Sequence, residues 1–434
     1  MEAHLIVQIT LCVLLFLLVI LVAVFLGLWF ARRPPQQNPS ICQQAVSDWS
    51  SMKIEGEIKI SERIVSFSES QTYSWDEFKD MLLEQGLSLS DDKNLIIIPK
   101  NEQLILSLGV IGTDEPVIIT VNLNDENTDT SKIGRRFLTN NGNFTVRGEV
   151  IGCQLIIRNG LGPAVEEGKT TAGGIRHENG SFNVEGVDII VEKCKAGFAG
   201  GIYFVYGFVH LLDGPAKTPG RIYARDCDAL ELTGGGICVW ESTVTIVSDD
   251  GIIECDNCST IHHGGGMITF YGHIILQGTS ATIRAINCSS GQIGSSFSYA
   301  GGLQFGENFP NYISGEYNPV INFVGQNSKL EAINCQSGGA AGVLIFKGYV
   351  CSQSPTASIV AENNTVYDNE ADTLRDKCSV QILNSLYYSQ WPLDIYIKNN
   401  ECVPSGCVDV YVNDWGNRIF PVNVIGDGTF TSRI

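Results

Sequence analysis

The segments that decide the fold are Ile222-Tyr-Ala-Arg-Asp226-Cys227, Ile253-Glu-Cys-Asp-Asn257-Cys258, Ile283-Arg-Ala-Ile-Asn287-Cys288 and Leu330-Glu-Ala-Ile-Asn334-Cys335. They share one frame: a large aliphatic residue, any residue, a small or aliphatic residue, any residue, Asn or Asp, and then Cys. Four looser copies place Asn159, Lys193, Asn363 and Asn399 in the Asn/Asp column, and differences between column positions range from 29 to 47 residues. Such short strands cannot bury their apolar side alone, so neighbouring copies must stack.

A second motif recurs in the same order as the first: a Gly-Gly pair followed by an aliphatic residue. It occurs at Gly173-Gly-Ile175, Gly200-Gly-Ile202, Gly235-Gly-Ile237, Gly265-Gly-Met267, Gly301-Gly-Leu303 and, more loosely, Ala341-Gly-Val343. In parallel coils, equivalent residues lie about 4.8 Å apart. We therefore expect the two aliphatic columns to point inward and the Asn/Asp column to turn a corner with a side-chain ladder. The Gly pair predicts a second corner that needs positive φ or close backbone approach.

The cysteine column fits a core position, because free Cys behaves as a small buried hydrophobe. Its members are Cys194, Cys227, Cys258, Cys288 and Cys335. Their spacing is that of whole coils and no His accompanies them, so we expect no metal site and no cofactor. Cys255 and Cys258 form a C-x-x-C pair, but Cys255 falls in an inward column, where core packing explains it better.

One soluble helix precedes the repeats, over residues 74–86. Ser74 is suited to cap it, Glu77 completes a capping box, and Gly86 ends it. We expect this amphipathic helix to cover the open end of the strand stack, which would otherwise present an exposed edge. Before it, residues 54–67 alternate apolar and polar side chains and predict a strand.

The N-terminal segment predicts a single transmembrane helix. Residues 5–30 carry no charge and are long enough to cross a bilayer. A signal peptide is the alternative, but no basic residue precedes Arg32. The positive-inside rule, applied to Arg32 and Arg33, places the large domain in the cytosol, whereas the cysteines and Asn-x-Ser/Thr sequons suggest an oxidising lumen. The side of the membrane stays open.

Five sequons occur, at Asn143, Asn179, Asn257, Asn287 and Asn363. The last three belong to the Asn/Asp column, so Asn143 and Asn179 are the glycosylation candidates. The expected organisation is a transmembrane anchor (1–33), a stalk (34–53), an N-terminal cap (54–94), a parallel β-helix (95–420) and a C-terminal end (421–434). The formal net charge of −19 makes nucleic acid and anionic lipid headgroups poor partners for the main body, and we expect no nucleic-acid binding.

These features carry a family resemblance over about residues 72–415. The run Gly134-Arg-Arg-Phe-Leu138, the segment from Leu155 to Gly160, Gly173-Gly-Ile175 and the capped helix upstream resemble the right-handed parallel β-helix of the pectin-lyase-like superfamily. The repeats are most similar to those of chlamydial polymorphic outer-membrane proteins and related surface β-helix proteins. The apolar N-terminal segment departs from that bacterial pattern. The resemblance implies an all-β solenoid and a role in adhesion or display.

The superfamily also contains polysaccharide lyases and glycoside hydrolases, so an enzyme is the alternative. The outward columns offer Arg225, Glu254, Asp256 and Arg284 as the best catalytic set. Their signs alternate between adjacent copies, which is typical of cross-strand ion pairs on a solvated face. We therefore assign no catalytic residue, and we read the pair His262-His263 as loop residues.

The preferred function is a non-catalytic structural, adhesion or ligand-binding module for a glycan or protein. The insertion between Asn287 and Asn334 is rich in aromatic residues suited to such contacts: Phe297, Tyr299, Phe305, Phe309, Tyr312 and Tyr317. The alternative is that they pack beneath their own loop. Elongated surface β-helices often trimerise, so a homo-oligomer stays open.

Overall fold

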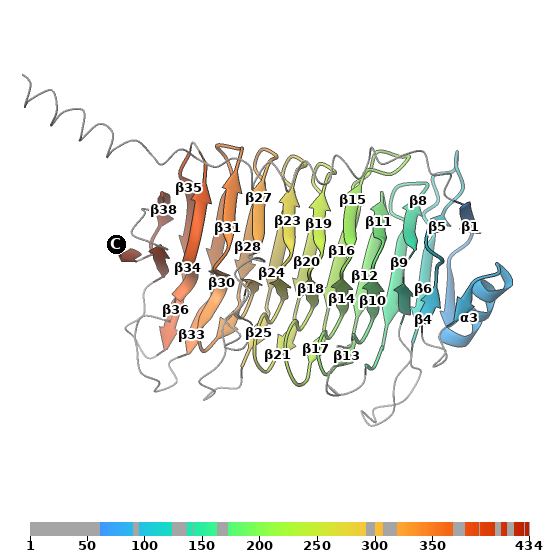
Figure 1. The fold of residues 1–434 in the computed structure, drawn as a ribbon, viewed down its shortest axis with the longest axis horizontal. Coiled ribbons are helices and arrows are strands. Elements are labelled where there is room, and N and C mark those ends of the chain that lie inside the picture. Colours follow the sequence, from blue (N-terminus) through green and yellow to red (C-terminus); the bar gives the residue numbers. More distant parts are fainter. Residues whose placement is uncertain are drawn as a thin grey trace, which may run out of the picture. The chain divides into compact units, whose positions relative to one another are not determined.

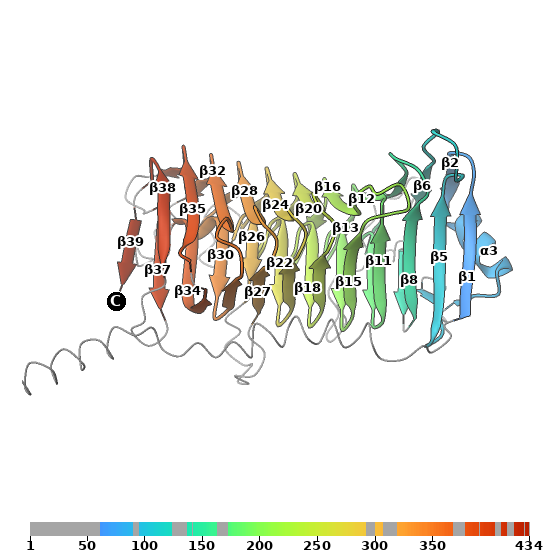
Figure 2. The same cartoon turned by 90° about the horizontal axis from the view of Figure 1, so that it is seen from above.

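The repeats form successive coils of short strands in the computed structural model. One coil consists of β10 (Ile175–Glu178), β11 (Ser181–Glu185), β12 (Asp188–Glu192) and β13 (Lys195–Ala196). Each of these strands pairs in parallel with the equivalent strand of the next coil. The coils therefore lie side by side along one axis, as Figures 1 and 2 show.

The structure describes residues 61–89, 95–123, 137–140, 142–162, 172–291, 300–306, 319–367, 378–389, 391–403, 409–414, 421–428 and 430–433. The predicted span 5–30 and the stalk lie outside these ranges. Within them, no helix is both long enough and apolar enough to cross a membrane.

Four strand positions of each coil define four faces, named A to D here. Face A contains β1 (Ser61–Phe67), β5 (Glu102–Leu108), β8 (Asn143–Gly148), β11, β15 (Phe208–Leu212), β19 (Thr243–Ile246), β23 (His273–Leu276), β27 (Val320–Phe323), β31 (Tyr349–Ser352) and the second half of β34 (Cys378–Tyr388). Face B is an 11-stranded sheet of β2 (Gln71–Ser74), β6 (Ile118–Asn122), β9 (Gln154–Arg158), β12, β16 (Arg221–Arg225), β20 (Ile252–Asp256), β24 (Thr282–Ile286), β28 (Lys329–Ile333), β32 (Ser358–Glu362), β35 (Leu393–Lys398) and β38 (Val422–Gly426).

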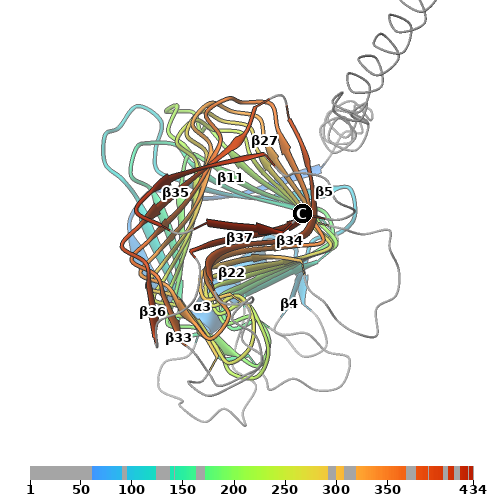
Figure 3. The same ribbon diagram turned by 90° about the vertical axis from the view of Figure 1, so that its left-hand side faces the viewer.

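Face C contains β3 (Ser88–Leu89), β4 (Leu95–Ile97), β7 (Phe137–Asn140), β10, β14 (Ile202–Val205), β18 (Ile237–Trp240), β22 (Met267–Phe270), β26 (Leu303–Phe305), β30 (Ala340–Phe346), the first half of β34, β37 (Val410–Asp414) and β39 (Phe430–Arg433). The short face D contains β13, β17 (Asp228–Ala229), β21 (Ser259–Thr260), β25 (Ser289–Ser290), β29 (Gln336–Ser337), β33 (Thr365–Tyr367) and β36 (Glu401–Val403). Seen along the axis in Figure 3, faces A, B and C surround the interior.

The aliphatic columns point inward, as predicted. In β16, Ile222 and Ala224 are fully buried, whereas Tyr223 and Arg225 between and beyond them are half-buried on the outside. Register is kept because a slip by one residue would turn the whole apolar set outward. The interior is one continuous stack of aliphatic and aromatic side chains along the coils.

The Asn/Asp column turns the corner between faces B and D, which confirms the predicted ladder. Its residues adopt left-handed backbone angles, for example φ 53° at Asn257 and 54° at Asn287. Asn and Asp accept this conformation more readily than other non-Gly residues. The side chains bond along the axis: the amide of Asn334 donates to Oδ1 of Asn287 at 3.1 Å, and that of Asn257 donates to Oδ1 of Asp226 at 2.6 Å.

The Gly-Gly pairs are required by close approach of neighbouring coils. A Cβ on Gly235 would lie 2.2 Å from the carbonyl oxygen of Gly265, and one on Gly236 would lie 2.7 Å from Sγ of Cys255. Neither Gly has positive φ; that conformation falls on Gly234, just before the pair. Of the two reasons predicted for the pair, the structure selects the second.

The predicted capped helix lies at the N-terminal end of the strand stack. Helix α3 (Trp75–Glu84) has Ser74 as its N-cap and a complete capping box with Glu77. Its buried residues, including Trp75 and Phe78, pack against the first coils, so the helix covers this end of the interior. Parallel pairing already begins at β1 with β5 and continues to β39 with β37.

Candidate functional site

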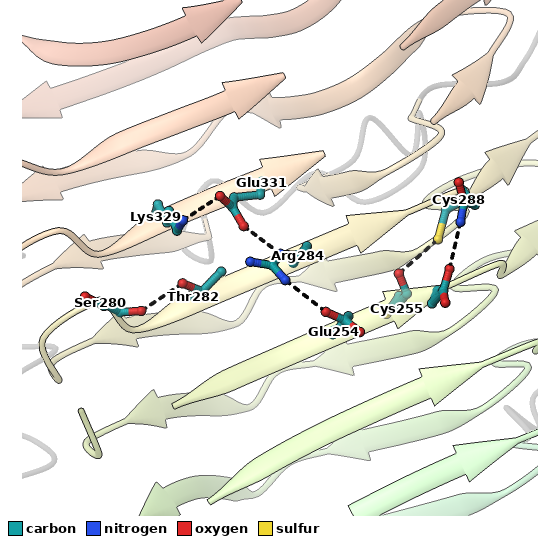
Figure 4. A network of polar contacts seen from close by, with 10 residues as sticks. Glu254, Cys255, Ser280, Thr282, Arg284, Cys288, Lys329 and Glu331 are labelled. Atoms are coloured by element: carbon teal, nitrogen blue, oxygen red, sulfur yellow. Dashed lines mark hydrogen bonds and ion pairs between the residues drawn. The ribbon is translucent and has the colours of Figure 1, made fainter. Parts of the chain in front are cut away.

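The four charged residues singled out as a catalytic set lie on the outer side of face B, on the neighbouring strands β16, β20 and β24. Figure 4 shows an ion-pair chain across β20, β24 and β28. Arg284 Nη1 lies 3.2 Å from Glu254, and Arg284 Nε lies 2.6 Å from Glu331 on β28. Lys329 completes the chain with an Nζ contact of 2.6 Å to Glu331. The predicted alternation of signs therefore produces cross-strand pairs.

The neighbours of Arg284 in this ion-pair chain stabilise its charged form. Burial alone would lower the pKa of Arg284, but the hydrogen bond and charge of Glu331, with Glu254, raise it above its ordinary value. Asp256 accepts a hydrogen bond from the amide of Asn287 at 3.0 Å, and the guanidinium of Arg225 lies 4.8 Å from the ring centre of Tyr223. The two carboxylates nearest to Arg284 are therefore engaged in ion pairs with it, and Asp256 belongs to the Asn/Asp ladder.

The predicted aromatic binding set is divided by the structure. Phe305 lies in β26 and is fully buried in the interior, so it fills the core and is removed from the candidate binding surface. Its register explains this, because it pairs with Thr269 and Ile345, which also point inward. Phe297, Tyr299, Phe309, Tyr312 and Tyr317 lie outside the described residues.

A different aromatic cluster lies on the outer side of face C, and the sequence analysis missed it. Loops that connect face D to face C place Phe198 and Leu232 over the outward side chains of three adjacent strands, β14, β18 and β22. The buried members of this outer cluster are Ala172, Phe198, Ala199, Tyr203, Val205, Cys238, Ile268 and Phe270, with Leu232, Trp240 and Tyr271 half-buried around them. Face C therefore has a small second core outside the main one.

Trp240 is the centre of the accessible rim of this cluster. Its ring lies 5.0 Å from that of Phe270 and 5.8 Å from that of Tyr271, measured between ring centres. The ring centre of Phe198 lies 6.3 Å from that of Trp240. The indole Nε1 donates to the carboxylate of Glu241 at 3.1 Å, which fixes the ring orientation. A half-buried indole packed against other aromatic rings offers its accessible part for stacking.

The corner that follows these strands carries unusual backbone geometry. Tyr206, Glu241 and Tyr271 follow β14, β18 and β22 and have φ of 54°, 43° and 53°. Bulky side chains in this region cost about 1 kcal/mol or more each, and the same corner has positive φ at Asn179 and Lys347, so this conformation belongs to the repeated turn. Tyr206 is 56% exposed. The three coils thus hold a row of aromatic and acidic side chains at one corner, which we call the corner row (Tyr206, Trp240, Glu241 and Tyr271).

A signal for the corner row exists in the sequence. In three of the six copies, the residues three and four places after the aliphatic residue of the Gly-Gly motif are Val205-Tyr206, Trp240-Glu241 and Phe270-Tyr271. Aligning the copies on the Gly pair instead of on the Asn/Asp column exposes this aromatic column. The burial of Ile268 and Phe270 on the outer side gives no such signal, because it depends on loops from another face.

The remaining candidates have local roles. Asn143 is half-buried at the start of β8, and its Oδ1 accepts from the backbone N–H of Ser181 at 3.1 Å. Asn179 is half-buried with φ of 56°. His262 and His263 lie in a loop between faces D and C, with ring centres 5.9 Å apart. Among the described residues, no group of three or more His, Cys, Asp or Glu side chains is placed to hold a metal ion.

Comparison with known proteins returns no relative. No protein-family model, no curated protein and no solved structure matches the chain. The parallel-strand solenoid thus stands on the structure itself.

Proposed function

We propose that this chain is a membrane-tethered, non-catalytic β-helix that binds a carbohydrate ligand through the corner row on face C. The observation that carries the proposal is the half-buried Trp240, packed on Phe270 and flanked by Tyr271 and the exposed Tyr206. Indole and phenol rings offer flat apolar faces that stack on the C–H side of a sugar ring, while Glu241 offers acceptor oxygens for its hydroxyls.

The form of the corner row supports an extended ligand. Val205, Trp240 and Phe270 are in register on adjacent coils, and the residues after them follow the same order. Tyr206, Glu241 and Tyr271 thus occupy equivalent positions on three coils about 4.8 Å apart, with Trp240 beside Glu241 on the middle coil. This arrangement favours a chain of sugar units lying along the axis over a single compact ligand. The net charge of −19 favours a neutral or cationic saccharide.

The proposal also includes the membrane anchor and a role in display or adhesion. Residues 5–30 would tether the domain to a membrane, and the resemblance to pectin-lyase-like and chlamydial surface β-helices supports display or adhesion. The paired charges on face B support a structural role for that surface, because each named carboxylate of the chain is already neutralised by a cation.

The test is a glycan array probed with the full chain in detergent. Wild type and two variants are compared: the double variant Tyr206→Ala/Tyr271→Ala, and Trp391→Ala as a matched control at an exposed aromatic residue elsewhere. Loss of two stacking contacts at about 1 kcal/mol each predicts a signal at least tenfold weaker for the double variant. The control Trp391→Ala is expected to bind as strongly as wild type. Equal binding by all three proteins, or no binding to any glycan, contradicts the proposal.

A further inference from the structure

The two ends of the strand stack differ in how they are covered. At the N-terminal end, β2 of face B leads directly into helix α3, whose Trp75, Phe78 and Leu82 are buried against the first coils. The first strand of face A, β1, also carries a charged pair, with Arg63 Nε 2.8 Å from the carboxylate of Glu102 on β5. A covering helix and charged side chains are two of the devices that prevent a sheet edge from pairing with another molecule.

The C-terminal end has neither device in the described part of the chain. Among the described strands, β38 pairs with β35 alone and is the last strand of face B. Its sequence is Val422-Asn-Val-Ile-Gly426, which contains no charged residue, and residues 421–428 contain no helix. The backbone N–H and C=O groups on the outer edge of β38 therefore face no described strand.

Apolar side chains are also incompletely covered at this end. Val422 and Val424 are the inward partners of Leu393 and Ile395 on β35. Leu393 and Ile395 have no exposed surface, whereas the two valines are only half-buried. Tyr387 pairs with an inward residue on the last strand of face A, β34, and is half-buried as well. The interior is therefore partly exposed to solvent at the C-terminal end.

We propose that two copies of the chain associate end to end through the C-terminal end surface (β38 with Tyr387, Val422 and Val424). The partner must cover the edge of face B and the open interior beside face A together. An extended peptide adds to one edge only, whereas a second copy brings the same uncharged edge and the same apolar side chains, related by a two-fold axis. Because α3 covers the other end, association stops at two copies and does not continue into a filament.

The size of the end is sufficient for a specific contact. Successive coils are 29 to 36 residues long, apart from 47 across the large insertion. At about 3.3 Å per residue, a coil of about 30 residues has a perimeter of about 100 Å and encloses about 500 Å² as a triangle. Two facing ends would bury about 1,000 Å² together, at the lower limit of specific interfaces. Since each copy has a net charge of −19, we expect a weak dimer that salt strengthens by screening.

The test is analytical ultracentrifugation of the full chain in detergent over a range of protein and salt concentrations. Ile425→Lys places a charge in the edge strand, at a residue that is 41% exposed and therefore tolerates the change. Ile118→Lys is the matched control, at a 37% exposed isoleucine on β6 of the same sheet. Wild type and control are expected to dimerise, and Ile425→Lys to weaken the dimer at least tenfold, because like charges would then meet in the interface.

Hydrogen exchange locates the contact independently of any variant. The backbone amides of residues 422–426 are expected to exchange more slowly at high than at low concentration of the wild-type protein. A wild type that stays monomeric, oligomers larger than two, a dimer equally strong in Ile425→Lys, or exchange that is independent of concentration overturns the proposal. None of these results depends on carbohydrate binding, so this inference and the proposed function fail separately.

Discussion

His177 provides a quantitative test of how the interior is built. It lies in β10, is fully buried, and its ring makes an edge contact with Phe182 at 5.5 Å between ring centres. Burial lowers its pKa from 6.5 to about 4, despite an opposing hydrogen bond that the imidazole donates to the backbone of Gly180. The folded protein therefore holds a neutral imidazole in its core.

The sign of the pH effect follows from this difference. Above pH 6.5 the imidazole is neutral in both states and contributes no pH dependence. As the pH falls from 6.5 towards 4, the unfolded chain binds a proton that the folded chain does not, so the free energy of unfolding decreases. At about 1.4 kcal/mol per pH unit the loss reaches about 3 kcal/mol near pH 4.

The perturbation is His177→Val, since Val239 occupies the equivalent position two coils further along the axis. Urea unfolding of wild type and variant is measured at several pH values between 7.5 and 4. A cavity lowers the stability of the variant equally at every pH, whereas the difference between the two proteins should shrink by about 3 kcal/mol on acidification. Two parallel stability curves would refute a buried neutral His177.

Three further changes test the ladders and the packing of the coils by the same unfolding assay. Gly236→Ala places a methyl group against Sγ of Cys255 and should cost about 1–3 kcal/mol; wild-type stability would contradict the close approach. Asn287→Ala removes two ladder hydrogen bonds and a residue suited to positive φ, with an expected loss of about 1–2 kcal/mol; no loss would show that the ladder is incidental. Arg284→Met leaves the buried carboxylate of Glu331 with one cation instead of two, and after allowance for solvent screening should cost about 1–2 kcal/mol. An unchanged midpoint would mean that the ion-pair chain contributes nothing.

The repeat made the interior predictable from sequence. Ile222, Ala224, Asp226 and Cys227 each recur in equivalent positions, so one assignment of inward and outward columns applied to every coil. The register left no freedom to shift a single strand, because its neighbours above and below impose the same alternation. The capped helix was equally predictable, because Ser74 and its capping-box partner Glu77 lie three residues apart in the sequence.

The candidate site was less predictable, for reasons of geometry. Phe305 stood out in sequence as part of an aromatic insertion, but its two-residue offset from Leu303 places it in the core. The run from Met267 to Phe270 is buried on both sides, so its apolar pattern does not reveal which residues face outward. Only the loops that bring Phe198 over face C make the outer cluster, and their path depends on contacts distant in sequence.

The most direct test of the carbohydrate-binding surface is radical footprinting of the full chain with and without the saccharide selected on the array. Oxidation rates of Trp240, Tyr271 and Tyr206 are measured by mass spectrometry, with Trp391 and Tyr396 as exposed references. Selective protection of the first three residues, growing with the length of the saccharide, is the predicted result. Protection of the references or of face B, with unchanged oxidation at Trp240, would contradict the assignment of the corner row.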